Sequence, residues 1–318
     1  MAARTGGTFT RRDAVQAGYT EREIKTLTGH DGGWVVLRRG VYVERSFHDD
    51  CSDDERYVLQ VRAVGRLLTK AAVISHTSAA ALHGLPMRNR WRELVHVTRP
   101  GVRGGRGESG VAHHRSELRP GSVVELGGLA VTGLARTGLD IGRSFGFEDG
   151  VVALDAALRL GATRQQLRDE LGRMWCWPGI SRSRAAAAFA DPGAATIGES
   201  VLRVLVAELD LGEIETQFEV TDGVRSTYAD LRIGRHLFEF DGRVKYVDRA
   251  RGGVADRPVH EVVWAEKRRE DWMRRTNGGY GMSRVVWSEM FGVERRRTQR
   301  RLRAEFDETV RRLGPLAA

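Results

Sequence analysis

The chain has 318 residues and a formal net charge of +9 at pH 7, from 51 lysines and arginines against 42 aspartates and glutamates. This length suffices for about two hydrophobic cores, and Cys51 and Cys176 form no CxxC or Cys/His cluster, so we expect neither a disulfide framework nor a structural zinc site. No apolar run approaches the roughly 18 residues of a membrane span and no apolar leader begins the chain, so the sequence predicts a cytoplasmic protein without a membrane partner.

Two capping boxes indicate helices in the first 48 residues. Thr10 is followed by Asp13, and Thr20 by Glu23. In this pattern the hydroxyl accepts a backbone amide while the acid reaches back to the cap. A tight turn at Gly18 separates the two helices, and two β-rich runs follow. The predicted helices and strands cover residues 10–17, 20–28, 34–37 and 41–43.

Two helices joined by a tight turn and followed by a hairpin predict a winged helix-turn-helix over residues 1–48. Its second helix would lie in the major groove, and the Arg-Arg-Gly turn between the strands would form the wing. The alternative is a module of this kind that only binds other proteins. The residues expected to contact double-stranded DNA are Arg22, Lys25, Arg38 and Arg39.

The same segment resembles the N-terminal winged-helix domain of AbiEi-type antitoxins, in the stretches Phe9–Gly18 and Leu37–Tyr42. The run Ser75–Pro86 also looks like that family. The resemblance implies an operator-binding regulator of transcription that represses its own promoter. It leaves a cognate toxin of a toxin-antitoxin pair as a candidate partner.

A mixed α/β region is predicted for residues 49–192. Ser52 and Glu55 form a third capping box, and Ser75 begins a helix of small residues that ends at Gly84. An Asp-Pro-Gly segment at 191–193 is typical of a joint, so we expect the domain boundary near 191–196. The predicted elements cover residues 52–68, 75–83, 94–98, 110–114 and 148–160.

Four histidines in this region raise the question of a metal site. His76 and His83 are seven residues apart on one predicted helix, a spacing that packing explains equally well. His113 and His114 lie on a predicted strand, and no Asp, Glu or Cys is found at ligand spacing from any of the four. We therefore expect these histidines to be structural.

The most informative stretch is a predicted hairpin of residues 227–233 and 236–241. A two-residue turn would pair 233 with 236, 231 with 238 and 230 with 239. Asp230 would then lie opposite Glu239, with Asp241 on the same face. Like charges in that position repel, and a hard cation such as Mg²⁺ or Mn²⁺ would remove the repulsion. The alternative is a solvent-facing pair that shares a proton or contacts Arg232.

Glu199 begins a predicted helix that would pack on this hairpin, where it could reach the same metal or pair with Arg203. Together these residues resemble the PD-(D/E)XK nuclease core, in the DUF559 branch related to very-short-patch repair endonucleases. The resemblance implies a mixed sheet flanked by helices, with Asp230, Glu239 and Glu199 as metal ligands and a basic residue that stabilises the transition state. The candidate catalytic residues are Glu199, Asp230, Glu239, Asp241, Lys245 and Lys267.

One position departs from the nuclease pattern. Asp241 stands where the family has its lysine, two residues after Glu239, so Lys245 or Lys267 would have to supply the positive charge. The nuclease-like domain is predicted for residues 193–292, and a basic helix for 293–318.

The predicted fold class is α+β or α/β throughout. The predicted function is DNA binding, with magnesium-dependent hydrolysis of DNA by an endonuclease-like domain. The rival is a non-catalytic regulator whose nuclease-like fold only binds DNA or dimerises.

Overall fold

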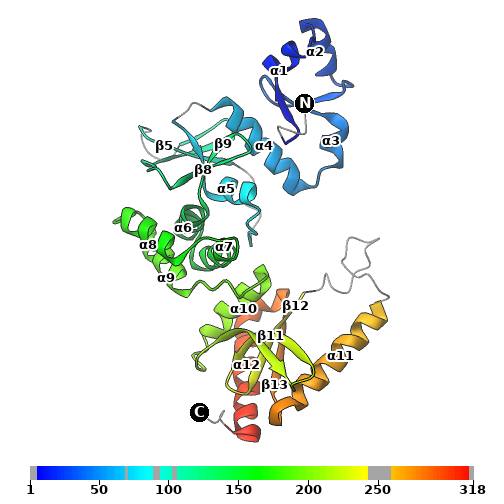
Figure 1. The fold of residues 1–318 in the computed structure, drawn as a ribbon, viewed down its shortest axis with the longest axis vertical. Helices are drawn as coiled ribbons and strands as arrows, with labels where there is room; N and C mark the ends of the chain where they lie inside the picture. The colour runs from blue at the N-terminus through cyan, green and yellow to red at the C-terminus, as the bar shows by residue number, and fades with distance from the viewer. Residues whose placement is uncertain (1–5, 69–70, 89–93, 102–105, 243–258, 315–318) are drawn as a thin grey trace. The chain divides into compact units, whose positions relative to one another are not determined.

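The computed structural model describes residues 6–68, 71–88, 94–101, 106–242 and 259–314. The chain divides into two compact units, residues 1–190 and 191–318 (Figure 1). Both units contain helices and strands, which agrees with the predicted mixed class. Cys51 and Cys176 are free thiols, as expected. In the described part of the chain, no helix is both long and apolar enough to cross a membrane.

The first unit begins with a small antiparallel sheet in the strand order β1-β3-β2 and two helices. Thr10 and Thr20 cap these helices through the predicted capping boxes. Phe9, Ile24 and Trp34 share a buried cluster, which holds α2 against the sheet. The bounds are β1 Thr8–Thr10, α1 Arg11–Gln16, α2 Glu21–Leu27, β2 Trp34–Arg38 and β3 Val41–Glu44.

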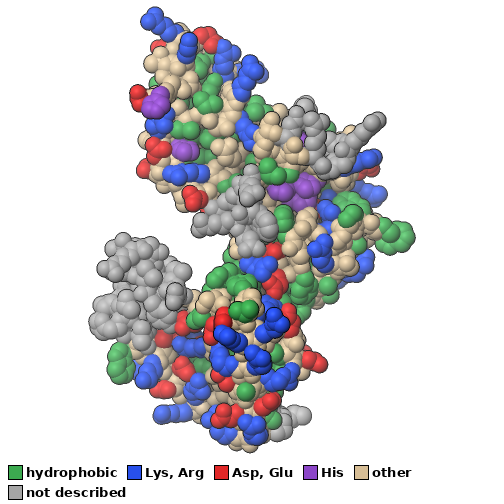
Figure 2. All heavy atoms as spheres, turned by 180° about the vertical axis from the view of Figure 1, so that it is seen from behind, with side chains coloured by type: hydrophobic (Ala, Val, Ile, Leu, Met, Phe, Trp, Pro, Cys, Tyr) green, Lys and Arg blue, Asp and Glu red, His purple; other side chains and the backbone are tan. Residues whose placement is uncertain are grey.

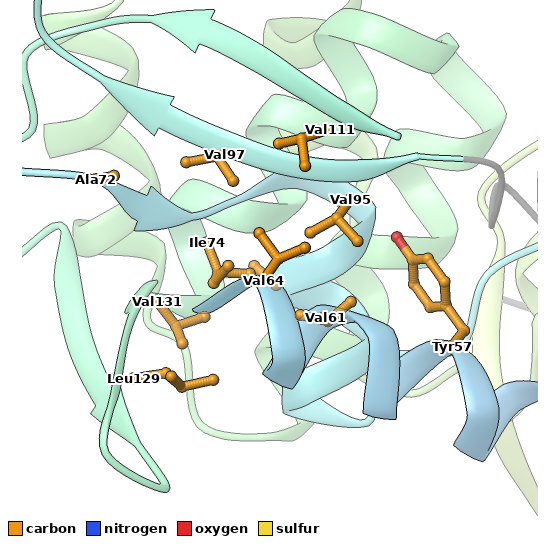
Figure 3. Packing of buried hydrophobic residues seen from close by; sticks show 11 residues of the cluster. Tyr57, Val61, Val64, Ala72, Ile74, Val95, Val97, Val111, Leu129 and Val131 are labelled. Carbon is orange, nitrogen blue, oxygen red and sulfur yellow. The ribbon is translucent and has the colours of Figure 1, made fainter. Parts of the chain in front are cut away.

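A mixed six-stranded sheet forms the centre of the first unit, in the order β6-β7-β5-β4-β9-β8. Val61 and Val64 of α4 share a core with Ile74, Val97 and Val131 of the sheet (Figure 3). This core fills one face of the sheet. The bounds are α3 Arg45–Asp50, α4 Asp53–Leu67, β4 Val73–Ile74, α5 His76–His83, β5 Val95–Arg99, β6 Arg106–Glu108, β7 Val111–Arg115, β8 Val123–Leu126 and β9 Leu129–Thr132.

Four helices complete the first unit: α6 Leu134–Phe145, α7 Phe147–Arg159, α8 Arg164–Arg173 and α9 Ile180–Phe189. Helices α6 and α7 approach closely where Gly142 faces Gly150, since a Cβ placed on Gly150 would lie 2.6 Å from the Cα of Gly142. Helix α6 also buries a charged pair, with Arg136 Nε donating to Asp140 Oδ2 at 2.8 Å.

The second unit has the element order helix, three strands, helix, strand, helix, and its four strands lie in the order β10-β11-β12-β13. The first three strands are antiparallel neighbours, whereas β12 and β13 are parallel and joined through α11. The bounds are α10 Ile197–Ala207, β10 Glu215–Thr221, β11 Ser226–Ile233, β12 His236–Asp241, α11 Val259–Arg275, β13 Gly281–Val286 and α12 Gly292–Leu313, with short 3-10 helices η4 Thr276–Gly278 and η5 Trp287–Met290.

Helices cover both faces of this sheet (Figure 1). Met273 of α11 packs with Leu237 of β12. On the other face, His236 of β12 bonds Thr309 of α12, and Gly198 of α10 lies against the ring of Phe240. Because successive strand residues point to opposite faces, β12 turns its odd-numbered residues toward α11 and its even-numbered residues toward α10 and α12.

Candidate functional sites

The two cations predicted to enter the DNA groove lie on the outer face of α2. Ile24 is 4% exposed and faces the core, whereas Arg22 and Lys25 are exposed. At about 100° per residue along a helix, Arg22 and Lys25 lie on the side away from Ile24. Both side chains are therefore available to a polyanion.

The two arginines of the predicted wing differ in their surroundings. Arg38 is partly buried, and its Nη1 donates a hydrogen bond to the carbonyl oxygen of Ser109. Arg39 is exposed at the turn between β2 and β3. Arg38 therefore ties this turn to the turn between β6 and β7, while Arg39 projects into solvent.

The predicted hairpin of the second unit forms with the expected register next to its turn. Ile233 pairs with His236, and Leu231 pairs with Phe238. Gly234 in the turn has φ +55°, a left-handed conformation that glycine adopts without strain. The turn and the register of residues 231–238 are thus as the sequence predicts.

The predicted pairing of Asp230 with Glu239 is not part of this register, because the regular pairing of β11 with β12 ends at Leu231. The pairing of β10 with β11 skips Gln217 and Asp230, and Gln217 has φ +48°. The carboxylate of Asp230 accepts a hydrogen bond from the backbone amide of Phe240 at 2.7 Å. Asp230 thus binds the backbone of β12, a contact that the pattern of side chains does not predict.

Glu239 is buried among basic side chains on the α11 face. It is 4% exposed, and its carboxylate lies 2.5 Å from Arg269 Nη2 and 3.4 Å from Arg284 Nη2. Arg284 also contacts Glu266 and Glu270, at 3.3 and 3.4 Å. Glu239 therefore belongs to a network of ion pairs with glutamates and arginines of α11 and β13, and its two arginine partners offset its negative charge.

Glu199 lies in the first turn of α10, on the other side of the sheet. Its carboxylate accepts from the amide of Ala195 at 2.7 Å, from the hydroxyl of Thr196 at 2.9 Å and from the side-chain amide of Gln217 at 3.0 Å. These bonds cap the helix and connect it to the irregular residue of β10. Glu239, by contrast, contacts Arg269 of α11 and Arg284 of β13.

The remaining predicted catalytic residues do not gather at one point. Asp241 is partly buried on the same side of β12 as Glu239, and Lys267 is exposed on α11. Lys245 lies outside the described residues. Within the described part of the second unit, no three His, Cys, Asp or Glu side chains bring ligand atoms within 4.8 Å of one another. The assignment of Asp230, Glu239 and Glu199 to a magnesium site stays a prediction.

The predicted basic helix forms as α12, but several of its arginines contact acids or backbone of the second unit. Arg295 lies 2.8 Å from Glu208, and Arg301 lies 3.2 Å from Glu289. Arg303 donates to the carbonyl oxygen of Leu209. These contacts favour a packing role for this face of the helix.

A cluster of three histidines in the first unit was not predicted. His76 stands at the beginning of α5, His96 on β5 and His114 on β7. Nδ1 of His96 and Nε2 of His114 lie 2.9 Å apart, and the rings of His76 and His114 stack with centroids 3.8 Å apart. One ligand atom of each histidine lies within 4.8 Å of the other two.

His76 is the most enclosed of the three. It is 1% exposed, has φ +52°, and its Nδ1 shares a hydrogen bond of 3.0 Å with Ser75. Among the described residues its Nε2 has no hydrogen-bond partner, although Asp140 Oδ1 lies 4.0 Å away. An imidazole nitrogen in such a position lacks the bond that buried polar atoms normally make.

Burial lowers the pKa of all three histidines. The pKa of His96 falls to about 4 through burial and the neighbouring His114. Burial likewise lowers the pKa of His114, and it lowers that of His76 well below the usual value, against the opposing effect of Asp140. At pH 7 the three rings are therefore neutral, the form in which imidazole offers a lone pair.

Sequence spacing gave little sign of this cluster, because its members come from three elements. His83, which was singled out with His76, bonds the carbonyl oxygen of Thr132 at 2.7 Å instead. The parallel pairing of Thr98 with His114 is what brings His96 and His114 to one face. The sequence does place His96 and His114 on two predicted strands, residues 94–98 and 110–114, but it does not indicate that these strands pair.

Comparison with known proteins adds no assignment. No protein-family model matches this chain, and a search of the curated proteins finds no significant match.

Proposed function

We propose that this chain is a duplex-DNA-binding protein whose N-terminal module, residues 6–44, carries the main contact surface. The observation that carries the proposal is the set of exposed cations on that module: Arg22 and Lys25 on the outer face of α2, and Arg39 at the turn between β2 and β3. A short capped helix beside a hairpin with cations on its outer face suits insertion into a DNA groove.

The net charge of +9 supports the same partner, because a cationic protein gains affinity for DNA through release of counterions. Acidic residues on α2 itself reduce the positive charge of that helix. One of them, Glu23, forms the capping box with Thr20. A regulator of transcription that binds its own operator is the specific role that the sequence resemblance suggests. A cognate toxin stays a candidate partner of that role.

The test measures affinity for a DNA duplex at several salt concentrations. A triple variant, Arg22→Ala with Lys25→Ala and Arg39→Ala, should bind more weakly. Each lost phosphate contact should also reduce the slope of log K against log salt by about 0.9. The matched control removes three exposed arginines elsewhere in the same unit, at Arg168, Arg182 and Arg184.

Equal losses in the two triple variants would assign the affinity to net charge and remove the N-terminal module as the contact surface. Arg38 is left intact in both variants. Its bond to Ser109 means that its removal would disturb the fold as well as any DNA contact.

A second candidate function is magnesium- or manganese-dependent cleavage of DNA by the second unit. The observation in its favour is the irregularity at Gln217 and Asp230, since a left-handed backbone at a non-glycine residue is costly and such strain gathers at functional sites. The ion pairs of Glu239 favour the non-catalytic alternative, because a metal would have to compete with Arg269 and Arg284.

A plasmid-cleavage assay with Mg²⁺ or Mn²⁺ distinguishes nuclease activity of the second unit from a non-catalytic role. Nuclease activity predicts nicked or linear plasmid with the wild type and none with Glu239→Gln. Intact plasmid under all conditions, together with wild-type DNA affinity, would leave DNA binding as the function of the chain.

A further inference from the structure

We propose that His76, His96 and His114 bind a divalent transition metal ion, with Zn²⁺ as the fitting ion. The site lies in the first unit and shares no residue with the carboxylates discussed in the second unit or with the exposed cations of α2. The proposal rests on geometry: three imidazoles from three elements converge within 4.8 Å, and the enclosed Nε2 of His76 has no hydrogen-bond partner among the described residues.

The spacing of the nitrogens is close to what a metal requires. With metal–nitrogen distances of about 2.0–2.1 Å, tetrahedral ligands lie roughly 3.3–3.4 Å apart. Nδ1 of His96 and Nε2 of His114 are 2.9 Å apart, so this pair would have to open by about half an ångström to admit the ion. The ring of His114 would also have to turn out of its stack on His76, where the two planes are 20° apart, so that both rings point at the ion. The ion would replace the proton that these two nitrogens share in its absence.

The surroundings of the three rings supply the support that metal-binding histidines usually have. The second nitrogen of His76, Nδ1, is oriented by the hydroxyl of Ser75 at 3.0 Å, which leaves Nε2 for the metal. The Ser75 hydroxyl in turn accepts from Thr98 at 2.8 Å. This chain of bonds fixes the ring of the most buried ligand before any ion binds.

Asp140 provides the negative charge nearest to the site. Its Oδ1 lies 4.0 Å from His76 Nε2, and the side chain is fully buried. Arg136 and Arg143 hold the carboxylate at 2.8 and 3.3 Å. Asp140 therefore offsets the charges of these arginines, of which Arg143 also lowers the pKa of His76 and His114, and we assign Asp140 a supporting role.

The ligand type decides which ions fit. Three imidazoles suit Zn²⁺ and neighbouring transition metals, whereas Mg²⁺ requires oxygen ligands. The site is thus chemically different from the magnesium site predicted in the second unit. His96 and His114 are partly exposed, so an ion can reach them from solvent.

In the experiment, the purified, metal-stripped full chain is titrated with Zn²⁺, and calorimetry measures the heat of binding. We expect one equivalent to bind, and a tenfold excess of Mg²⁺ not to compete. Two single variants, His96→Gln and His114→Gln, should each weaken binding by at least about tenfold. The matched control is His113→Gln, next to His114 on β7 but on the opposite side of the strand, which should bind as the wild type does.

Co²⁺ serves as a second, spectroscopic probe. Bound by nitrogen and oxygen in a tetrahedral site, it gives visible d–d bands, which should vanish in both ligand variants. A thiolate charge-transfer band would place the ion at Cys51 or Cys176 and overturn the proposal. Absence of one-equivalent Zn²⁺ binding, or undiminished binding in either folded ligand variant, would overturn it as well; circular dichroism shows which variants fold.

Discussion

At the scale of single residues, the second unit contains a buried histidine whose protonation opposes folding. His236 is 1% exposed, with Nδ1 bonded to Thr309 at 2.7 Å and Nε2 to Ser283 at 2.8 Å. Burial, helped by the charges of Arg274 and Arg312, lowers its pKa to about 4. An unfolded histidine titrates near 6.5, so the unfolded chain binds the proton more readily between pH 4 and 6.5.

This difference predicts how stability depends on pH. Because the folded-state pKa is the lower one, the contribution of His236 is complete above pH 6.5 and is lost as pH falls toward 4. Between pH 7 and pH 5 the loss of this contribution should lower the free energy of unfolding by about 2 kcal/mol. His236→Gln keeps a hydrogen-bonding side chain that does not titrate there, so its urea-unfolding free energy should fall less over the same interval. An identical pH dependence in the two proteins would contradict the assignment.

Asp230 offers a second test at this scale. Repulsion between facing carboxylates would make Asp230→Ala neutral or stabilising. The bond from the Phe240 amide to Asp230 Oδ2 reverses that expectation, since removing the acceptor leaves a partly buried N–H without this bond. We expect Asp230→Ala to lose about 1–3 kcal/mol. Asp230→Asn, which keeps a side-chain oxygen, should lose less, and urea unfolding of the two variants at pH 7 gives the comparison.

At the scale of elements, the contact between α6 and α7 depends on glycine. A Cβ on Gly150 would lie 2.6 Å from Gly142 Cα and 3.0 Å from Ala186 Cβ. The first neighbour is backbone, so the helices would have to separate. Gly150→Ala should therefore destabilise the first unit by about 1–3 kcal/mol, although alanine favours a helix.

Gly172 provides the matched control for that substitution. It lies in α8, where an added Cβ would meet nothing within 4 Å. Gly172→Ala should stabilise the unit by up to about 1 kcal/mol through helix propensity alone. If both variants melt at or above the wild-type temperature, the close packing of α6 on α7 does not constrain residue 150.

Elements were predictable where their signals are local. The capping boxes at Thr10, Thr20 and Ser52 identify the first residues of α1, α2 and α4, and the turn at Gly234 sets the hairpin register. Helix α6 was not predicted, although its apolar residues recur at helical spacing. The charged residues Arg136 and Asp140, which pair with each other in the core, lie among those apolar residues.

The candidate sites depended on non-local contacts, which a single sequence does not specify. The alternation of β11 predicts which face Asp230 occupies, but the left-handed Gln217 on the neighbouring strand interrupts it. The partners of Glu239 come from α11 and β13, some 30 and 45 residues further along the chain. The histidine cluster needs the parallel pairing of β5 with β7, which spacing alone cannot indicate.

At the scale of the whole molecule, a net charge of +9 does not amount to a uniformly basic surface. Figure 2 shows acidic and basic side chains intermingled over the second unit. Contacts such as Arg295 with Glu208 and Arg232 with Glu215 account for part of this mixture. The exposed cations of α2 are therefore a more specific guide to a polyanion than the total charge is.

Each unit has a core of its own, which predicts separable folding. The first is built around Ile74 and Val97, and the second around Leu237 and Met273. A fragment of residues 191–318 should therefore unfold cooperatively by itself, since a domain with its own core can fold alone. It should also retain the stability loss between pH 7 and pH 5 that we assign to His236, because Thr309 and Ser283 lie in the same fragment. In the full chain, Gly150→Ala should shift the unfolding transition of the first unit. It should leave the transition of the second unit, residues 191–318, in place. A fragment without a cooperative transition, or one that loses the pH dependence, would show that the second unit needs the first to complete its core.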